Sequence, residues 1–131
     1  MSLVEAARTY IGTPFHHQGR AKGYGVDCVG LVVCVARDAG YTVRDITAYG
    51  RDPDGASLVG AVAEQLERVD HPEPGDVLMF WVARPGLPQH VGICAGKTMI
   101  HAPIGRRVCE HRLTRAMLDK LHSAWRFPAN V

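Results

Sequence analysis

The chain has 131 residues, a length that suits one domain with its own buried core. Hydrophobic residues make up 47% of the sequence and charged residues 21%, which is typical of a globular protein. The net charge of +2 at pH 7, without any basic run, excludes an extended phosphate-binding surface, so we expect no nucleic-acid partner. We expect residues 1–131 to form a single domain.

The first part of the chain predicts a helix followed by a loop. Ser2 and Glu5 form a capping box, which favours a helix from about Leu3 to Tyr10. The segment 15–26 contains three glycines and little hydrophobic periodicity. Glycine-rich, aperiodic segments are typical of loops, so we expect a loop there.

A second helix is predicted directly after this loop. Asp27 is a typical N-cap residue, and the pattern that follows predicts a helix over Cys28–Ala39 that ends at Gly40. The helix is apolar on nearly every side up to Arg37, so we expect it to be buried. The segment Val43–Gly55 contains a proline and several charges, and we expect it to cross the surface.

The pattern of apolar residues changes in the second half of the sequence. Residues 56–69 have helical spacing of apolar side chains, and residues 72–76 form a strong break. Short apolar runs separated by glycine-containing turns then predict strands. These strands are Val77–Val82, His90–Ala95, Thr98–Ala102, Arg107–Arg112 and Ala124–Phe127. A short helix from Thr114 to about Leu121 is also predicted. Helices followed by a small antiparallel sheet indicate an α+β fold.

No membrane span or signal peptide is predicted. The longest apolar stretch, Val29–Ala36, is shorter than the roughly 20 residues that cross a bilayer. The N-terminus lacks the basic and apolar segments of a signal peptide, so we expect synthesis in the cytoplasm. The four cysteines contain no Cys-x-x-Cys pair, and we expect free thiols.

Cys28 occupies the first position of the second predicted helix. Unpaired N–H groups and the helix dipole favour negative charge there, which would depress the thiol pKa and create a nucleophile. Its own N–H group would also be placed to bind an oxyanion. Gly30 would leave room for a substrate near the helix start. The alternative is that Cys28 is a small buried residue, which is a common fate of cysteine.

A cysteine nucleophile needs a base, and His90 and His101 are the candidates. His90 follows a loop at the start of a strand, and His101 lies on the next strand. A tight turn between these strands would bring the two rings together, so that His101 could fix the tautomer of His90. Alternatively, both histidines are satisfied within the sheet. The other five are interpreted as solvated: His16, His17, His71, His111 and His122.

The order of these motifs resembles the NlpC/P60 cysteine peptidases. The segments are Gly12-Thr-Pro-Phe15, Gly25-Val-Asp-Cys-Val-Gly-Leu31, Pro74-Gly-Asp-Val77, His90-Val-Gly-Ile93 and Ile100-His101-Ala102. The resemblance covers the chain from about Thr9 to Phe127. The run Phe-His-His-Gln-Gly-Arg resembles the phage-type branch of the family, which is found in tail proteins and gene transfer agents.

The resemblance implies a papain-like core, with the nucleophile at a helix N-terminus packed on a small antiparallel sheet. It implies a triad of Cys28, His90 and His101 and the hydrolysis of peptides from bacterial peptidoglycan, often at the γ-D-glutamyl–diaminopimelate bond. It implies no metal or organic cofactor. The partners expected from it are peptidoglycan stem peptides and phage-like tail proteins, and the site of action is the cell wall after delivery by a phage-like particle.

One departure from the family concerns the surroundings of the thiol. Many relatives have tyrosine where this chain has Phe15, and the missing hydroxyl would line the oxyanion site. Tyr24 or His17 are the residues that could compensate. We therefore expect Phe15, His17, Tyr24 and Asp27 to contribute to substrate or oxyanion binding.

Other functions also fit parts of this sequence pattern. The chain could be a structural component of a phage-like tail tip with weak or lost activity, or a related amidase or acyltransferase. Lipid acyltransferase relatives place histidine before cysteine, and the order here is reversed. A zinc site is disfavoured, because no two candidate ligands were judged close in the sequence.

Overall fold

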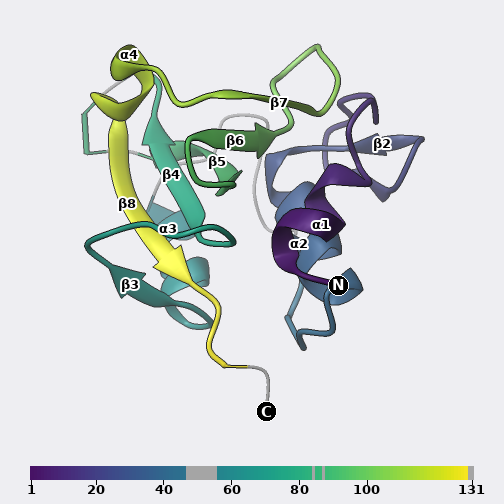
Figure 1. Cartoon of the computed structure of the whole chain (residues 1–131), viewed down its shortest axis with the longest axis horizontal. Coiled ribbons are helices and arrows are strands. Elements are labelled where there is room, and N and C mark those ends of the chain that lie inside the picture. Colours follow the sequence, from purple (N-terminus) through teal and green to yellow (C-terminus); the bar gives the residue numbers. More distant parts are fainter. Residues whose placement is uncertain (47–55, 84, 87, 130–131) are drawn as a thin grey trace.

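The computed structural model describes residues 1–46, 56–83, 85–86 and 88–129 (Figure 1). The helices in this part of the chain are α1 (Leu3–Arg8), α2 (Cys28–Asp38), α3 (Ala56–Ala63) and α4 (Arg115–Leu118). The strands are β1 (Arg20–Ala21), β2 (Gly25–Val26), β3 (Glu67–Val69), β4 (Val77–Trp81), β5 (Pro88–Cys94), β6 (Thr98–His101), β7 (Cys109–Arg112) and β8 (Leu121–Arg126). The predicted α+β class is confirmed.

Six strands form one antiparallel sheet in the order β3-β8-β4-β5-β6-β7. The strands β4, β5, β6 and β7 correspond to four of the predicted strands, and the last predicted strand is the end of β8. Figure 1 shows α1 and α2 side by side next to the sheet, with α4 at its opposite end. None of the described helices is both long and apolar enough to cross a bilayer.

Two predicted segments differ from the structure. The segment 15–26 is not only loop, because Arg20 and Ala21 pair with Val26 and Gly25 to form a small hairpin. The helix predicted over 56–69 ends at Ala63, and residues 67–69 pair with β8 instead. Pairing with a distant strand overrides local helical spacing there. Of the expected surface crossing, residues 47–55 lie outside the described residues.

Helix α2 packs into two parts of the core. Its residues Leu31 and Val35 share one apolar cluster with Ile93 of β5. Its residues Val29 and Val33 belong to a second cluster with side chains of α3, β4, β5 and β8. The buried position predicted for this helix is therefore confirmed, and two sides of the helix pack into the core.

An ion pair between Asp76 and Arg126 holds the turn before β4 against the end of β8. Gly75 adopts a left-handed backbone conformation with φ of 96°, which suits glycine. Asp76 is 2% exposed and receives two hydrogen bonds from the Arg126 guanidinium, at 3.0 and 2.9 Å. Asp76 also accepts from the backbone N–H of Glu73 at 2.7 Å. This bidentate contact joins the start of β4 to the end of β8.

Candidate active site

Cys28 is the first residue of α2, as predicted. The Asp27 side chain caps this helix by accepting a hydrogen bond from the N–H of Gly30 at 2.7 Å. The backbone amides of Cys28 and Val29 act on the thiol and favour its ionised form. These groups are the donors that a helix start leaves without intrahelical partners. An oxyanion formed at this position would meet the same donors.

Asp27 also holds the preceding segment against the helix. Asp27 is 3% exposed, and its carboxylate accepts from the backbone N–H of Gln18 at 2.8 Å and from Arg20 at 3.1 Å. The Arg20 guanidinium also donates hydrogen bonds to the Asp45 carboxylate and to the carbonyl of Ile46. The carboxylate predicted to contribute to substrate binding is therefore part of an internal network that shapes the helix start.

Gly30 has a different role from the one its sequence position suggested. A Cβ atom at Gly30 would lie 2.1 Å from the Gly19 carbonyl oxygen and 2.7 Å from a guanidinium nitrogen of Arg20. The space beside Gly30 is thus occupied by the protein's own chain, and it does not admit a substrate. The prediction that this glycine leaves room for substrate is wrong.

Burial decides the protonation state of the Cys28 thiol. Removal from water raises its pKa to about 11, while the backbone amide of Val91 has the strongest opposing effect. The negative charge of Asp27 raises the pKa further. The expected depression of the pKa by the helix start is wrong, because desolvation outweighs the helix donors. The interaction with Val91 places the thiol against β5, one residue beyond His90.

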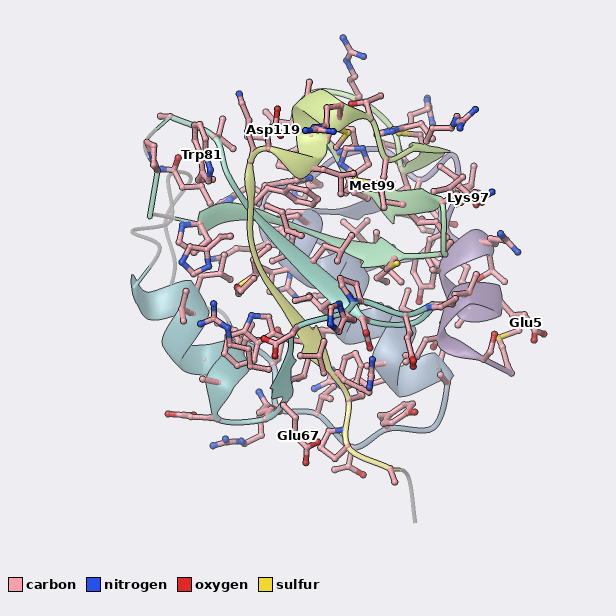
Figure 2. The ribbon with its side chains drawn as sticks, turned by 60° about the vertical axis from the view of Figure 1, so that its left-hand side comes forward. Glu5, Glu67, Trp81, Lys97, Met99 and Asp119 are labelled. Carbon is pink, nitrogen blue, oxygen red and sulfur yellow. The ribbon has the colours of Figure 1, made fainter. Side chains whose placement is uncertain are left out.

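His90 and His101 lie in contact, as predicted from the turn between their strands. His90 Nε2 and His101 Nδ1 are 2.7 Å apart, and the rings meet edge to face. His90 pairs with Phe80 at the end of β4 next to Trp81, and Lys97 in the β5–β6 turn marks the opposite end of these strands (Figure 2). The histidine pair therefore sits toward the Trp81 end of the sheet.

Gly92 makes this contact possible. A Cβ atom there would lie 2.5 Å from the Met99 Cε atom and 3.1 Å from the His101 Cβ atom. Gly92 is two residues beyond His90 on the same strand, so both positions lie on one face of β5. The missing side chain leaves room for the body of His101 to lie over the strand and reach the His90 ring.

A third histidine extends the pair. The Nε2 atoms of His101 and His111 are 2.7 Å apart, and His111 Nδ1 lies 2.9 Å from the backbone oxygen of Arg112. We call His90, His101 and His111 the histidine chain. The polar neighbours of His111 in the sequence favour a solvated side chain. The alternation of side chains along a strand was the signal that could have placed His111 on the same sheet face as Cys109.

One set of tautomers satisfies every contact in the histidine chain when all three rings are neutral. The Arg112 carbonyl can only accept, so Nδ1 of His111 carries a proton. With neutral rings, His101 then donates from Nε2 to His111, and His90 donates from Nε2 to His101 Nδ1. Nδ1 of His90 is left unprotonated, which is the form that a general base requires.

Burial keeps the inner rings neutral. It lowers the pKa of His90 to about 4 and the pKa of His101 to about 3, with a smaller contribution from the neighbouring histidines. His101 is 7% exposed. Together with the raised pKa of the Cys28 thiol, these shifts give a resting site made of a neutral thiol and neutral imidazoles at pH 7.

The other residues predicted to line the site differ in how far they are buried. Phe15 is half-buried and packs against the core beside α1 and α2. Tyr24 lies in the β1–β2 turn with 87% of its surface exposed, which leaves few contacts for it inside the protein. His17 is half-buried in the segment before Asp27. Cys94 is buried with Leu78 and Met99.

Three potential metal ligands also come together. One ligand atom from each of His101, Cys109 and His111 lies within 4.8 Å of the others. Cys109 and His111 are separated by a single residue, so the judgement that no two candidate ligands are close in the sequence is wrong. The alternating side chains of a strand place both on one face of β7.

The chain matches a known family over most of its length. The model of the NlpC/P60 family matches residues 12–126. None of the curated proteins matches the chain.

Solved NlpC/P60 domains share this fold. A lipoprotein-like NLP/P60 protein of Staphylococcus aureus superposes with a TM-score of 0.72 at 21% identity, over 98% of this chain but only 41% of that protein. The NlpC/P60 domain of the peptidoglycan hydrolase SagA gives 0.65 at 28% identity, over 95% of both chains. The P60 domain of an antigen from M. avium paratuberculosis gives 0.63 at 16% identity, over 96% of this chain and 90% of that one.

Proposed function

Because the chain belongs to the NlpC/P60 family, we propose that it is a cysteine peptidase with Cys28 as nucleophile, His90 as general base and His101 as the residue that orients the base. The observation that carries this proposal is the 2.7 Å contact between His90 Nε2 and His101 Nδ1. When His90 donates from Nε2 across this contact, its Nδ1 is free to act as the acceptor. The Cys28 thiol supplies the proton from the neighbouring helix start.

The protonation states determine how the reaction begins. Burial raises the pKa of Cys28 and lowers that of His90, so both groups are neutral before substrate binds. His90 Nδ1 takes the thiol proton as sulfur attacks the amide carbon. The carbonyl oxygen of the substrate becomes negative and accepts hydrogen bonds from the backbone amides at the start of α2. Such donors contribute about 3 kcal/mol each in the transition state.

The second half of the reaction uses the same groups in reverse. His90 gives the proton from Nδ1 to the leaving amine, which departs and leaves an acyl-enzyme on Cys28. A water molecule then gives a proton to His90 Nδ1 and attacks the acyl carbon, and sulfur leaves and regains its proton. His101 keeps the ring of His90 in one orientation throughout. His111 acts through His101 as a positioning residue.

For the substrate we propose the peptides of bacterial peptidoglycan, which places the site of action at the cell wall. The support is membership of the family and the similarity to a domain of a peptidoglycan hydrolase at 28% identity. Within these peptides, the γ-D-glutamyl–diaminopimelate bond is the proposed target, as the family resemblance implies.

Purified muropeptides of the diaminopimelate type test this function. The wild-type protein should split them at one bond, and mass spectrometry of the two products identifies that bond. Cys28→Ala should give no product while its circular dichroism and melting temperature stay close to wild type. Full activity in this variant would remove Cys28 from the mechanism. No cleavage by wild type at high enzyme concentration would favour a structural role in a phage-like tail instead.

A further inference from the structure

One sheet face carries a soft ligand set next to the proposed catalytic pair. His101 on β6 lies directly opposite Cys109 on β7, and His111 follows Cys109 after one residue. The ligand atoms of these three residues lie within 4.8 Å of one another. His101 is buried, while Cys109 and His111 are half-buried, so an ion could enter from the side of β7. The cluster is thus compact and accessible.

We propose that His101, Cys109 and His111 bind Zn²⁺ or a similar divalent cation and that this binding switches off the peptidase. The inhibition rests on the proposed function, whereas the binding site does not. Tetrahedral zinc takes histidine nitrogen at about 2.0–2.1 Å and cysteine sulfur at about 2.3 Å, which separates ligand atoms by roughly 3.3–3.7 Å. The two histidine nitrogens would move apart from 2.7 Å, and the sulfur would move closer.

The surroundings of the ligands favour zinc over calcium or magnesium. Two imidazoles and a thiolate are ligands for borderline and soft metals, whereas calcium and magnesium require oxygen. Glu110, the carboxylate between Cys109 and His111 in the sequence, is held by Arg8 at 3.0 Å and by Thr98 at 2.6 Å. A water molecule would supply the fourth ligand of the ion.

The second ring nitrogen of each histidine already lies against a hydrogen-bond partner. Metal-binding histidines usually donate their second N–H to a carbonyl or another acceptor, which fixes the ring. His111 donates from Nδ1 to the Arg112 carbonyl and therefore presents Nε2 to the cluster. His101 has its Nδ1 against His90 Nε2, so its Nε2 is directed to the same point.

The metal would reverse the tautomer of the proposed base. An ion on His101 Nε2 takes the place of the proton there, and His101 must then carry its proton on Nδ1. That proton comes from His90 Nε2, and His90 takes up at Nδ1 the proton that His101 lost. The count of histidine protons is unchanged, while Cys109 releases one proton to water on becoming a thiolate. His90 Nδ1 then carries a proton and cannot accept the one on Cys28.

Metal binding can be measured without any peptidase assay. Co²⁺ and Zn²⁺ are titrated into Cys28→Ala, which removes the proposed nucleophilic thiol, and into the double variant Cys28→Ala/Cys109→Ala. We expect one ion per chain in the first protein, with a thiolate-to-cobalt absorption band in the near ultraviolet. The double variant should lose the band and bind Zn²⁺ at least tenfold more weakly. No binding by Cys28→Ala, or an unchanged band in the double variant, would overturn the site.

Inhibition is tested on the active protein. Zn²⁺ should lower kcat of the wild type, and Cys109→Ala, which keeps the whole histidine chain, should need at least tenfold more Zn²⁺ for half inhibition. Equal inhibition of the two proteins would overturn the inhibitory role. Cobalt binding as expected together with no peptidase activity in metal-free buffer would instead contradict the proposed function and leave the metal site standing.

Discussion

The Nε2 atoms of His101 and His111 lie 2.7 Å apart on neighbouring strands, at a distance that a single shared proton bridges. This contact links a residue that the family resemblance implies to one that it does not. When His111 is neutral and donates from Nδ1 to the Arg112 carbonyl, the tautomer of the proposed base is set two rings away from it. The position of the proton on His90 therefore depends on side chains from β5, β6 and β7.

Replacement of His111 tests this link. His111→Leu removes the acceptor for His101 Nε2–H, so the orientation of His90 is held less firmly. We expect kcat to fall about 10-fold to 100-fold, the usual effect of misplacing a catalytic group, with little change in KM. His111→Gln offers an amide oxygen as acceptor and should recover part of the loss. The assays contain a chelator. Equal kcat for the leucine variant and wild type would contradict the positioning role.

Gly92→Ala should displace the histidine pair without replacing any ionisable residue. The new Cβ atom would meet the Met99 side chain and push against the His101 Cβ atom at 3.1 Å. We expect a loss of about 1–3 kcal/mol in the free energy of unfolding from overpacking, and a lower kcat in the folded protein. Urea denaturation and initial rates measure the two effects.

Gly60→Ala is the matched control for that variant. Gly60 lies inside α3, and a Cβ atom there has no neighbour within 4 Å among the described residues. Helix propensity predicts a gain of about 0.5–1 kcal/mol. If both alanine variants had the same stability and activity, the close approach of Gly92 to His101 would not limit the site.

The reactivity of Cys28 should follow its raised pKa. At pH 7 a thiol with this raised pKa is protonated, so its alkylation by iodoacetamide should be slower than that of an ordinary thiol with pKa near 8.5. The rate should keep rising tenfold per pH unit until the pH approaches about 11. Peptide mass spectrometry separates Cys28 from the other cysteines, and the urea-unfolded chain provides the reference. Equal rates at pH 6 and pH 9 would mean that a thiolate is already present, contrary to this expectation.

Asp76→Asn should weaken the link between β4 and β8. The carboxylate is buried and receives two hydrogen bonds from Arg126, so the change removes a charge-assisted pair worth about 2 kcal/mol. The folded variant should keep wild-type kcat. Asp119→Asn is the control, because its ion pair with Arg115 is exposed and should change stability by less than about 1 kcal/mol. Equal unfolding free energies in the two variants would argue against the link.

Local signals predicted the parts of the fold that local interactions determine. Asp27 caps α2 as expected, because a carboxylate two or three residues before free N–H groups needs no distant partner. The turn between β5 and β6 likewise sufficed to predict the contact of His90 with His101. Residues 67–69 were assigned to a helix because their pairing partner on β8 is more than fifty residues away.

The parts of the site that were missed depend on burial by distant segments. His111 has charged neighbours in the sequence, and only the pairing of β6 with β7 brings it to His101. The raised pKa of Cys28 comes mainly from desolvation by the surrounding fold, which a helix position does not reveal. Gly30 was interpreted as open space because the sequence does not show that Gly19 lies against it.

Helix α2 carries the proposed nucleophile and is wedged between two apolar clusters, while the base stands on the sheet. The distance between sulfur and imidazole is therefore a measure of how far the helix stands from the sheet. Val33 of α2 and Met79 of β4, neither of which belongs to the histidine chain, help to set that spacing. If heating loosens the packing of α2 against the sheet, kcat should fall at temperatures where most of the backbone remains folded.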